Sequence, residues 1–330
     1  MVPCICTPCT ILFLFLGDDF MIDLHYDLLS ILYYCYKMND YRYIETIQKY
    51  YQENGVKGVV ANLYFMSEEE MKEELGKFYE PIDVVKMFKI STDLFKKYFP
   101  ALDVVYSIEG CDYIKNVSQL EELYELGLRN VLLVWNNKNE YGSGNRSSQG
   151  LTSRGIEFLH KAVELGISID LSHMNKNTFA DTVEVLKKEQ SQGKNVKVIV
   201  SHSNCFDVYS HPRNLTDDQL LSIKDLNPVV GLVSYGSFVS SSENLNELKM
   251  DYVNHIMHVK NLLGINSIGV STDDMKFDSV LFGAEEDIQV FNYSNVYNEI
   301  KCLLSDVLSE NEVNKILYEN SYNQLFRKEV

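Results

Sequence analysis

The stretch MIDLHYDLL, residues 21–29, has the apolar character of a buried strand, yet Asp23, His25 and Asp27 interrupt it at every second position. Side chains alternate across a strand, so these three groups would project from one face. Burying them together is unfavourable unless a cation pairs with them. A metal ion would supply that cation, and a solvated edge strand with a few polar side chains is the alternative explanation.

Apolar runs that end in a polar residue recur along the chain. Eight such runs alternate with amphipathic helical patterns, several of which finish at a glycine, as helices often do. This alternation predicts a (β/α)8 TIM-type barrel, with residues 21–330 as one domain. An open doubly wound sheet is the alternative, but no glycine-rich phosphate loop follows the first run. The runs are MIDLHYD from residue 21, GVVANLYF from 58, LDVVYSIEG from 102, NVLLVWNN from 130, ISIDLSH from 167, VKVIVSHS from 196, PVVGLVSY from 228 and SIGVSTDD from 267.

Residues 1–20, MVPCICTPCTILFLFLGDDF, differ from the rest of the chain. Their apolar part is too short to span a bilayer, and it lacks both a preceding Lys or Arg and a small-residue cleavage site. We therefore expect a non-native extension, with a signal-like segment as the alternative. The seven cysteines show no disulfide-framework spacing, which favours reduced thiols and a cytoplasmic location.

The charge balance argues against two classes of partner. The formal net charge is -17, and the sequence pI is about 4.8. A field of this sign repels phosphate backbones and anionic lipid surfaces. The sequence therefore predicts no nucleic-acid partner and no membrane partner.

The carboxyl ends of barrel strands meet at one rim, where the active sites of such barrels lie. Imidazole and carboxylate groups together suit zinc or similar divalent ions, and one bridging carboxylate would hold two of them. The four histidines that fall on predicted helices or loops are expected to have surface or packing roles; they are His160, His211, His255 and His258. The polar residues at the predicted strand ends are His25, Asp27, Glu109, Trp135, Asn136, His173, His202 and Asp273.

With these strand ends placed, the chain resembles the membrane dipeptidase family, a group of renal dipeptidase-like zinc metallopeptidases, from about residue 21 onward. The motifs that carry the resemblance are His-x-Asp at His25 and Asp27, Glu-Gly at Glu109, the stretch GLTSRGIEFLHKAVELGISIDLSH, the stretch VIVSHSNCFDVYSHPRNLTDDQL, and GVSTDD. The Pro-Arg-Asn-Leu stretch after a Ser-His-Ser strand is quite specific, whereas His-x-Asp alone is not.

The resemblance implies a role for each of these positions. It makes His25, Asp27 and Glu109 ligands of one zinc ion, and it makes Glu109, His173 and His202 ligands of a second. Arg213 would bind the free carboxylate of the substrate, a task that suits a planar fork of donors. Asp273 would be the acid/base. Independently of the resemblance, Asp23 is expected to hydrogen-bond to the metal ligands if it points with them. A homodimer is a further expectation.

The chain departs from the family pattern in two places. Trp135 and Asn136 stand where many members have a histidine that assists the substrate carbonyl, although an indole or amide N–H can still donate a hydrogen bond there. Met275 stands where a second Asp is common. These departures bear on substrate range more than on activity.

The resulting hypothesis is hydrolysis of dipeptides. A hydroxide bridging two zinc ions would attack the peptide carbonyl, and Asp273 would pass a proton to the leaving amine. Acceptance of a C-terminal D-residue is left open. The alternatives are another two-metal barrel hydrolase, acting on a cyclic amide or lactone, and a non-catalytic peptide-binding relative. Against the first, such barrels usually begin with His-x-His, where this chain has Asp27 in the second place.

Overall fold

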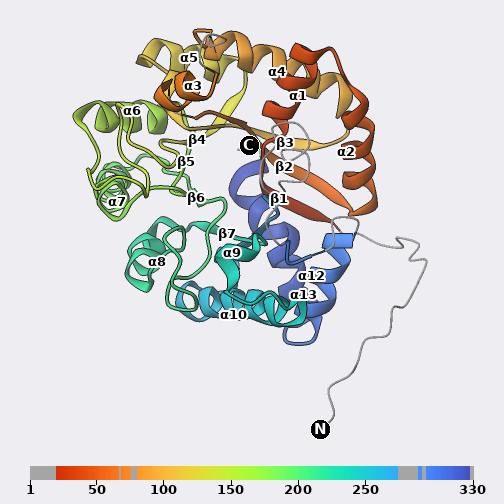
Figure 1. Ribbon diagram of the computed structural model, residues 1–330. Coiled ribbons are helices and arrows are strands. Elements are labelled where there is room, and N and C mark those ends of the chain that lie inside the picture. Colours follow the sequence, from red (N-terminus) through yellow and green to blue (C-terminus); the bar gives the residue numbers. More distant parts are fainter. Residues whose placement is uncertain (1–19, 67, 76–79, 274–288, 292–294, 328–330) are drawn as a thin grey trace.

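The computed structural model describes residues 20–66, 68–75, 80–273, 289–291 and 295–327. Eight parallel strands form a closed barrel in the order of the sequence, which confirms the predicted fold (Figure 1). The strands are β1 (Met21–Tyr26), β2 (Val56–Tyr64), β3 (Asp103–Glu109), β4 (Leu128–Leu132), β5 (Ser168–Asp170), β6 (Val198–Val200), β7 (Val229–Val233) and β8 (Ile268–Ser271).

Helices surround the ring of strands and cover its outer surface (Figure 1). Their buried faces form one continuous apolar core with the outward-facing strand residues. The α-helices are α1 (Leu28–Met38), α2 (Arg42–Glu53), α3 (Glu68–Leu75), α4 (Val84–Tyr98), α5 (Val117–Glu125), α6 (Ser153–Glu164), α7 (Lys176–Ser191), α8 (Asp217–Ile223), α9 (Gly236–Val239), α10 (Leu245–Leu263), α12 (Val296–Ser305) and α13 (Glu310–Asn314). Short 3₁₀ turns cover Cys111–Tyr113, Lys224–Leu226 and Ile265–Ser267, and two π-helical turns, η6 (Lys315–Glu319) and η7 (Tyr322–Phe326), follow α13.

The interior of the barrel is partly polar, and its polar groups bond to one another. Asn130 Nδ2 donates to Ser107 Oγ over 2.9 Å, and Ser168 Oγ donates to Asn130 Oδ1 over 2.8 Å. All three side chains are buried. A hydrogen-bonded group of this kind avoids the cost of leaving a buried donor or acceptor unpaired.

The turns η6 and η7 close the end of the barrel where the strands begin. Four of their side chains, Tyr318, Tyr322, Leu325 and Phe326, pack on an apolar cluster of Ile22, Leu24, Val60, Val105 and Val229. In Figure 1 this blue segment lies within the ring of strands, beside β1. Gly58 makes room for it, since a Cβ atom at this position would lie 3.1 Å from the Phe326 ring.

Seven of the eight strands are shorter than the apolar runs that predicted them. The fourth run extends through residue 137, but β4 ends at Leu132, so Trp135 and Asn136 lie in the loop that leads to α6. The expected N-terminal extension consists almost entirely of residues 1–19, and Met275 belongs to residues 274–288. Both stretches lie outside the described residues.

Candidate metal centre and active site

The candidate ligands meet at the carboxyl rim of the barrel because each one sits at or just after a strand end. His25 belongs to β1 and Glu109 ends β3, whereas His173 and His202 follow β5 and β6. The backbone at His173 takes a positive φ of 67°, and α7 begins shortly afterwards, capped by Asn175. A left-handed residue turns the chain sharply, which directs the His173 ring back over the barrel mouth.

Glu109 lies between two groups of nitrogen donors. Its Oε2 atom is 3.1 Å from His25 Nε2, and its Oε1 atom is 3.0 Å from His173 Nε2 and 3.6 Å from His202 Nε2. The carboxylate is only 2% exposed. Each of its oxygens therefore faces a different histidine group, as a carboxylate that bridges two cations would.

His173 and His202 point the same ring atom at each other. Their Nε2 atoms are 2.8 Å apart, and both lie near Glu109 Oε1. Within the described residues, His25, Glu109 and His202 also place one donor atom each within 4.8 Å of one another. Nitrogen and oxygen donors in this arrangement fit zinc or a neighbouring divalent ion.

The two carboxylates at the open side of His25 are placed almost alike. Asp27 Oδ1 lies 3.9 Å from His25 Nε2, and Asp273 Oδ1 lies 3.8 Å from the same atom. Asp273 also has a positive φ of 44°, and its N–H donates to the His25 carbonyl. Asp27 and Asp273 are therefore both within reach of the first histidine.

Burial and neighbouring charges set the protonation of these groups. Burial lowers the pKa of His173 to about 3, with a further contribution from Arg213, and burial lowers the pKa of His202 well below its usual value. Burial alone would lower the pKa of His25, but the negative charges of Glu109, Asp273 and Asp27 outweigh it and raise that pKa to about 10. In the absence of metal, His25 is therefore the protonated partner of Glu109.

The far side of each histidine ring is held by an uncharged side chain. His173 Nδ1 is 3.1 Å from Asn136 Oδ1, His25 Nδ1 is 3.0 Å from Asn62 Nδ2, and His202 Nδ1 is 2.7 Å from Ser201 Oγ. Asn62 and Ser201 were not singled out from the sequence. Asn62 is a polar residue within the apolar run GVVANLYF, and Ser201 is one within VIVSHS. A polar residue inside an apolar run indicates a buried hydrogen bond, which would have marked both positions as candidates.

Asp23 supports the backbone of the site. Its carboxylate accepts hydrogen bonds from the N–H groups of His25 and Thr272 and from the Thr272 hydroxyl. Burial raises its pKa to about 6. Asp23 thus joins β1 to the end of β8 and touches the His25 backbone.

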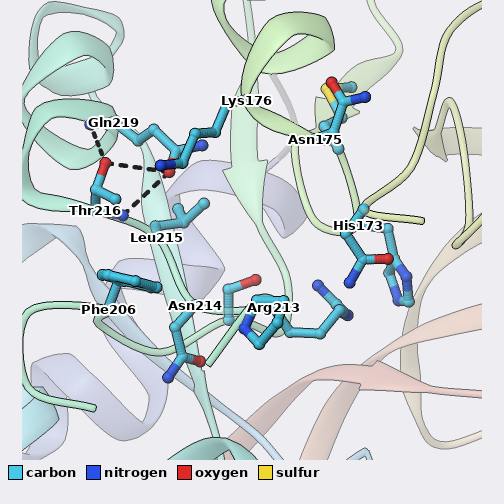
Figure 2. Close-up of a pocket in the computed structure, with 13 residues that line it drawn as sticks. His173, Asn175, Lys176, Phe206, Arg213, Asn214, Leu215, Thr216 and Gln219 are labelled. Atoms are coloured by element: carbon cyan, nitrogen blue, oxygen red, sulfur yellow. Dashed lines mark hydrogen bonds between the residues drawn. The ribbon is translucent and has the colours of Figure 1, made fainter. Parts of the chain in front are cut away.

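Arg213 lies beside the centre and faces a cavity of about 210 Å³ that His173 also lines. Figure 2 shows its guanidinium group directed toward His173. The side chain is buried, and its Nη2 atom has no hydrogen-bond partner within the described part of the chain. Burial lowers its pKa to about 10, so the group remains cationic at neutral pH. A buried cation with an unused donor is suited to an anionic group of a ligand.

Trp135 stands on another side of His173, with the two ring centroids 6.1 Å apart. Its indole packs edge-on against Tyr64 at 5.1 Å, and the Arg146 guanidinium lies 5.7 Å from its centroid. Asn136 contacts His173 itself. Trp135 therefore forms an aromatic wall beside His173, whereas Asn136 contacts the side of the His173 ring that faces away from the other candidate ligands.

The other four histidines make contacts elsewhere. His160 lies 3.0 Å from Glu189, and His258 lies 2.6 Å from Asp217. His255 is buried, accepts the N–H of Cys205, and lies 2.9 Å from the Val239 carbonyl oxygen. His211 stacks on Phe238.

The sequence profile of the membrane dipeptidase family matches residues 16–327. The chain belongs to this family. Curated relatives include an uncharacterised dipeptidase of Schizosaccharomyces pombe, 30% identical over 204 residues, which cover 60% of this chain and 47% of the relative. The dipeptidase verJ of Clonostachys rogersoniana is 29% identical over 192 residues, covering 56% of this chain and 46% of that protein. The chain thus spans about half the length of these two relatives.

Solved structures share the fold over nearly the whole chain. A metallopeptidase from Rhodobacter sphaeroides, liganded with a phosphinate mimic of the dipeptide L-Ala-D-Ala, superimposes with a TM-score of 0.72 at 20% identity and covers 93% of this chain and 98% of its own. An amidohydrolase from Pseudomonas aeruginosa gives a TM-score of 0.63 at 18% identity, covering 92% of this chain and 95% of that one. At these identities the likeness shows the barrel fold alone.

No helix in the described part of this membrane dipeptidase family member is long and apolar enough to cross a bilayer. The homodimer and the cytoplasmic location stay predictions.

Proposed function

We propose that the protein is a dipeptidase that uses two divalent metal ions, zinc by preference. His25, Asp27 and Glu109 would hold one ion, and Glu109, His173 and His202 would hold the other. The two-sided contacts of Glu109 support this division. When bound, the ions would polarise the scissile carbonyl and supply a nucleophilic water at neutral pH.

The position of Arg213 is the observation that favours a dipeptide as the substrate. The Arg213 guanidinium is buried, its Nη2 donor has no partner among the described residues, and it faces the same cavity as His173, so it is a ready partner for the C-terminal carboxylate of a peptide. Because the anchor and one proposed metal ligand, His173, line one cavity, only a short peptide would place its carboxylate and its scissile bond correctly together. Free dipeptides meet this requirement.

Asp273 is proposed as the acid/base. Burial raises the pKa of its carboxyl group, which favours a group that can carry a proton near neutral pH. Its side chain is 21% exposed, so it borders both the cluster and the open mouth of the barrel. Trp135 would form the wall of the site on the side of Tyr64.

Amino-acid release from a panel of L,L and L,D dipeptides, followed by ninhydrin, tests the proposal. Chelation should abolish the activity, and added zinc, cobalt or manganese should restore it. Full activity in protein shown by elemental analysis to be metal-free would exclude the metal mechanism. Turnover of a cyclic amide or lactone in place of dipeptides would favour a different amidohydrolase, and peptide binding without turnover would favour a non-catalytic relative.

A further inference from the structure

The cavity beside Arg213 is lined by positive charge only. It lies between His173 and the N-terminal ends of α7 and α8 (Figure 2). Its wall contains two cations, Arg213 and Lys176, and no aspartate or glutamate among the described residues. The whole chain has 47 acidic and only 30 basic residues, so this wall is opposite in charge to the protein as a whole. A cleft lined by charges of one sign concentrates ligands of the other sign.

Lys176 is the first residue of α7, a position where the helix dipole disfavours a cation. The first turn of α7 holds no acidic residue, and Lys176 forms no ion pair within the described part of the chain. Its ammonium group lies 5.9 Å from the centroid of the Phe206 ring, which also lines the cavity. Lys176 therefore adds positive charge where the helix end is already positive, and helix stability does not account for it.

Two buried donors in the same wall lack partners. Arg213 is 7% exposed and Ser203 is 0% exposed, and neither Arg213 Nη2 nor Ser203 Oγ has a hydrogen-bond partner among the described residues. A buried donor without a partner is unfavourable, so both groups suit a ligand that accepts hydrogen bonds. An ionised carboxylate has acceptor oxygens only and can take hydrogen bonds from both.

The two cations are far enough apart to bind two different groups of one ligand. Figure 2 shows Arg213 next to His173, and Lys176 well separated from both, toward Thr216. A dipeptide with its main-chain carboxylate on Arg213 and its peptide bond at the metal centre has one further group to place in this cavity. That group is the side chain of its C-terminal residue, which would extend toward Lys176.

We propose that Lys176 determines specificity by selecting dipeptides whose C-terminal residue is acidic, either aspartate or glutamate. Arg213 and Ser203 would bind the main-chain carboxylate, and Lys176 would pair with the side-chain carboxylate. The positive end of α7 would strengthen this second contact. The inference rests on the dipeptidase activity proposed above and adds the class of substrate.

Two dipeptides of nearly the same shape test the role of Lys176. The quantity measured is kcat/KM for L-Ala-L-Glu divided by kcat/KM for L-Ala-L-Gln, since these substrates differ in charge and hardly in size. We expect a wild-type ratio of roughly 3 to 10, the range for a partly exposed ion pair assisted by a helix end. Salt screens such a pair, so the ratio should fall toward one between about 0.05 M and about 1 M salt.

Substitutions of Lys176 separate charge from shape. Lys176→Met keeps the length of the side chain and removes the charge, so the ratio should fall to about one. Lys176→Arg should retain the preference, and Lys176→Glu should bring the ratio below one. Lys188→Ala is the matched control, because Lys188 is an exposed lysine of the same helix that does not line the cavity. It lies about 18 Å further along α7, beyond the range of unscreened charge, so the ratio should stay at the wild-type value.

Calorimetric titration of chelator-treated protein with the same two peptides measures the cavity without turnover. L-Ala-L-Glu should bind more tightly than L-Ala-L-Gln by a similar factor, and Lys176→Met should remove the difference. Hydrolysis with a wild-type ratio of one, or with a ratio that Lys176→Met leaves unchanged, would overturn the role of Lys176 and leave a dipeptidase in place.

Two further outcomes are distinct from these. Asn145 also lines the cavity, and its buried Oδ1 atom has no partner within the described residues. A wild-type ratio below one would indicate that this oxygen accepts from a side-chain amide, and it would also overturn the inference. If neither peptide is hydrolysed but L-Ala-L-Glu binds more tightly in a manner that depends on Lys176, the acidic subsite stands and the dipeptidase activity falls. If neither peptide is hydrolysed or bound, both proposals fall.

Discussion

His173 and His202 face each other through their Nε2 atoms at 2.8 Å, and burial lowers the pKa of both rings. Two neutral imidazoles stay at this distance only if one proton shared between the two nitrogens, or a cation between them, offsets the repulsion of their lone pairs. In a tetrahedral zinc site with Zn–N bonds of about 2.1 Å, the two nitrogens would lie about 3.4 Å apart. Ion binding therefore needs only a small outward movement of the two rings.

Replacing Glu109 by Gln should reduce the bound zinc from two ions to at most one. The amide keeps one carbonyl acceptor, and its other end can only donate, so it cannot serve both histidine groups. Elemental analysis of the purified variant measures the loss. Glu189→Gln is the matched control, because Glu189 is also 2% exposed but pairs with His160 and Lys194. Two ions retained at wild-type affinity in the Glu109 variant would contradict the bridge.

Arg213→Lys should lower kcat/KM for a free dipeptide by roughly 10- to 100-fold, the range for losing a hydrogen bond to a charged group. The same substitution should have little effect on the C-terminal amide of that dipeptide, because the amide has no carboxylate to anchor. Lys176→Ala, which removes an exposed cation from the same cavity, should affect both substrates alike. Equal losses on dipeptide and amide in the Arg213 variant would remove Arg213 as the anchor.

Asp273→Asn should leave the metal content near wild type while kcat falls by roughly 10²- to 10⁴-fold, the usual contribution of a positioned acid/base. The limb of the pH profile that reports this carboxyl group should also disappear. Since Asp273 and Asp27 lie almost equally far from His25 Nε2, the metal content is the decisive measurement. A variant that loses an ion would make Asp273 a ligand, and near-normal turnover would move the acid/base role to another residue, with Asp274 the first to test.

Zinc binding should release a proton from His25. Its pKa in the metal-free protein is raised to about 10, so the ring is protonated at pH 7 and must lose that proton to become a ligand. Affinity should therefore rise with pH up to about pH 10. Calorimetry at pH 7.5 in buffers of different ionisation enthalpy should show about one proton released in excess of that from His25→Gln.

The same ion pair predicts how the metal-free protein responds to pH. A histidine whose pKa is higher in the folded state stabilises the fold fully below its ordinary pKa of 6.5, and this stabilisation is lost as the pH rises toward about 10. The thermal midpoint of chelator-treated protein should fall over that window. His25→Gln should flatten this part of the profile, and an unchanged slope would contradict the pairing with Glu109.

The sequence was sufficient for the barrel and for the residues at its rim, because strand ends are marked by polar residues after apolar runs. It placed His25, Glu109, His173 and His202 at one rim, and the structure brings them within hydrogen-bonding or ion-pair distance. Such a pattern lies within one short stretch of sequence, so it can be recognised without knowing which strands are neighbours in the barrel. The positions of Trp135 and Asn136 were harder to predict, because the apolar run continues beyond the last residue of β4.

Contacts between distant strands could not be predicted from the sequence. Ser201 on the β6 side meets His25 on β1, a separation of 176 residues, and Asn62 meets the same ring from β2. Which ring each side chain reaches depends on the register and tilt of the closed barrel. A single polar residue in an apolar run indicates a buried hydrogen bond but does not identify its partner.

The closure of the barrel by η6 and η7 affects how the protein is made. Ile22 and Leu24 belong to the first strand, but the side chains that cover them, including Tyr322 and Phe326, belong to residues synthesised about 300 positions later. At 5 to 20 residues per second, β1 waits on the order of 15 to 60 seconds for its β8 neighbour and its apolar cover. The nascent chain therefore exposes an unpaired strand edge throughout most of translation, so chaperones have time to bind it. A chain terminated after α13 would lack η6 and η7 and would leave the barrel open at one end.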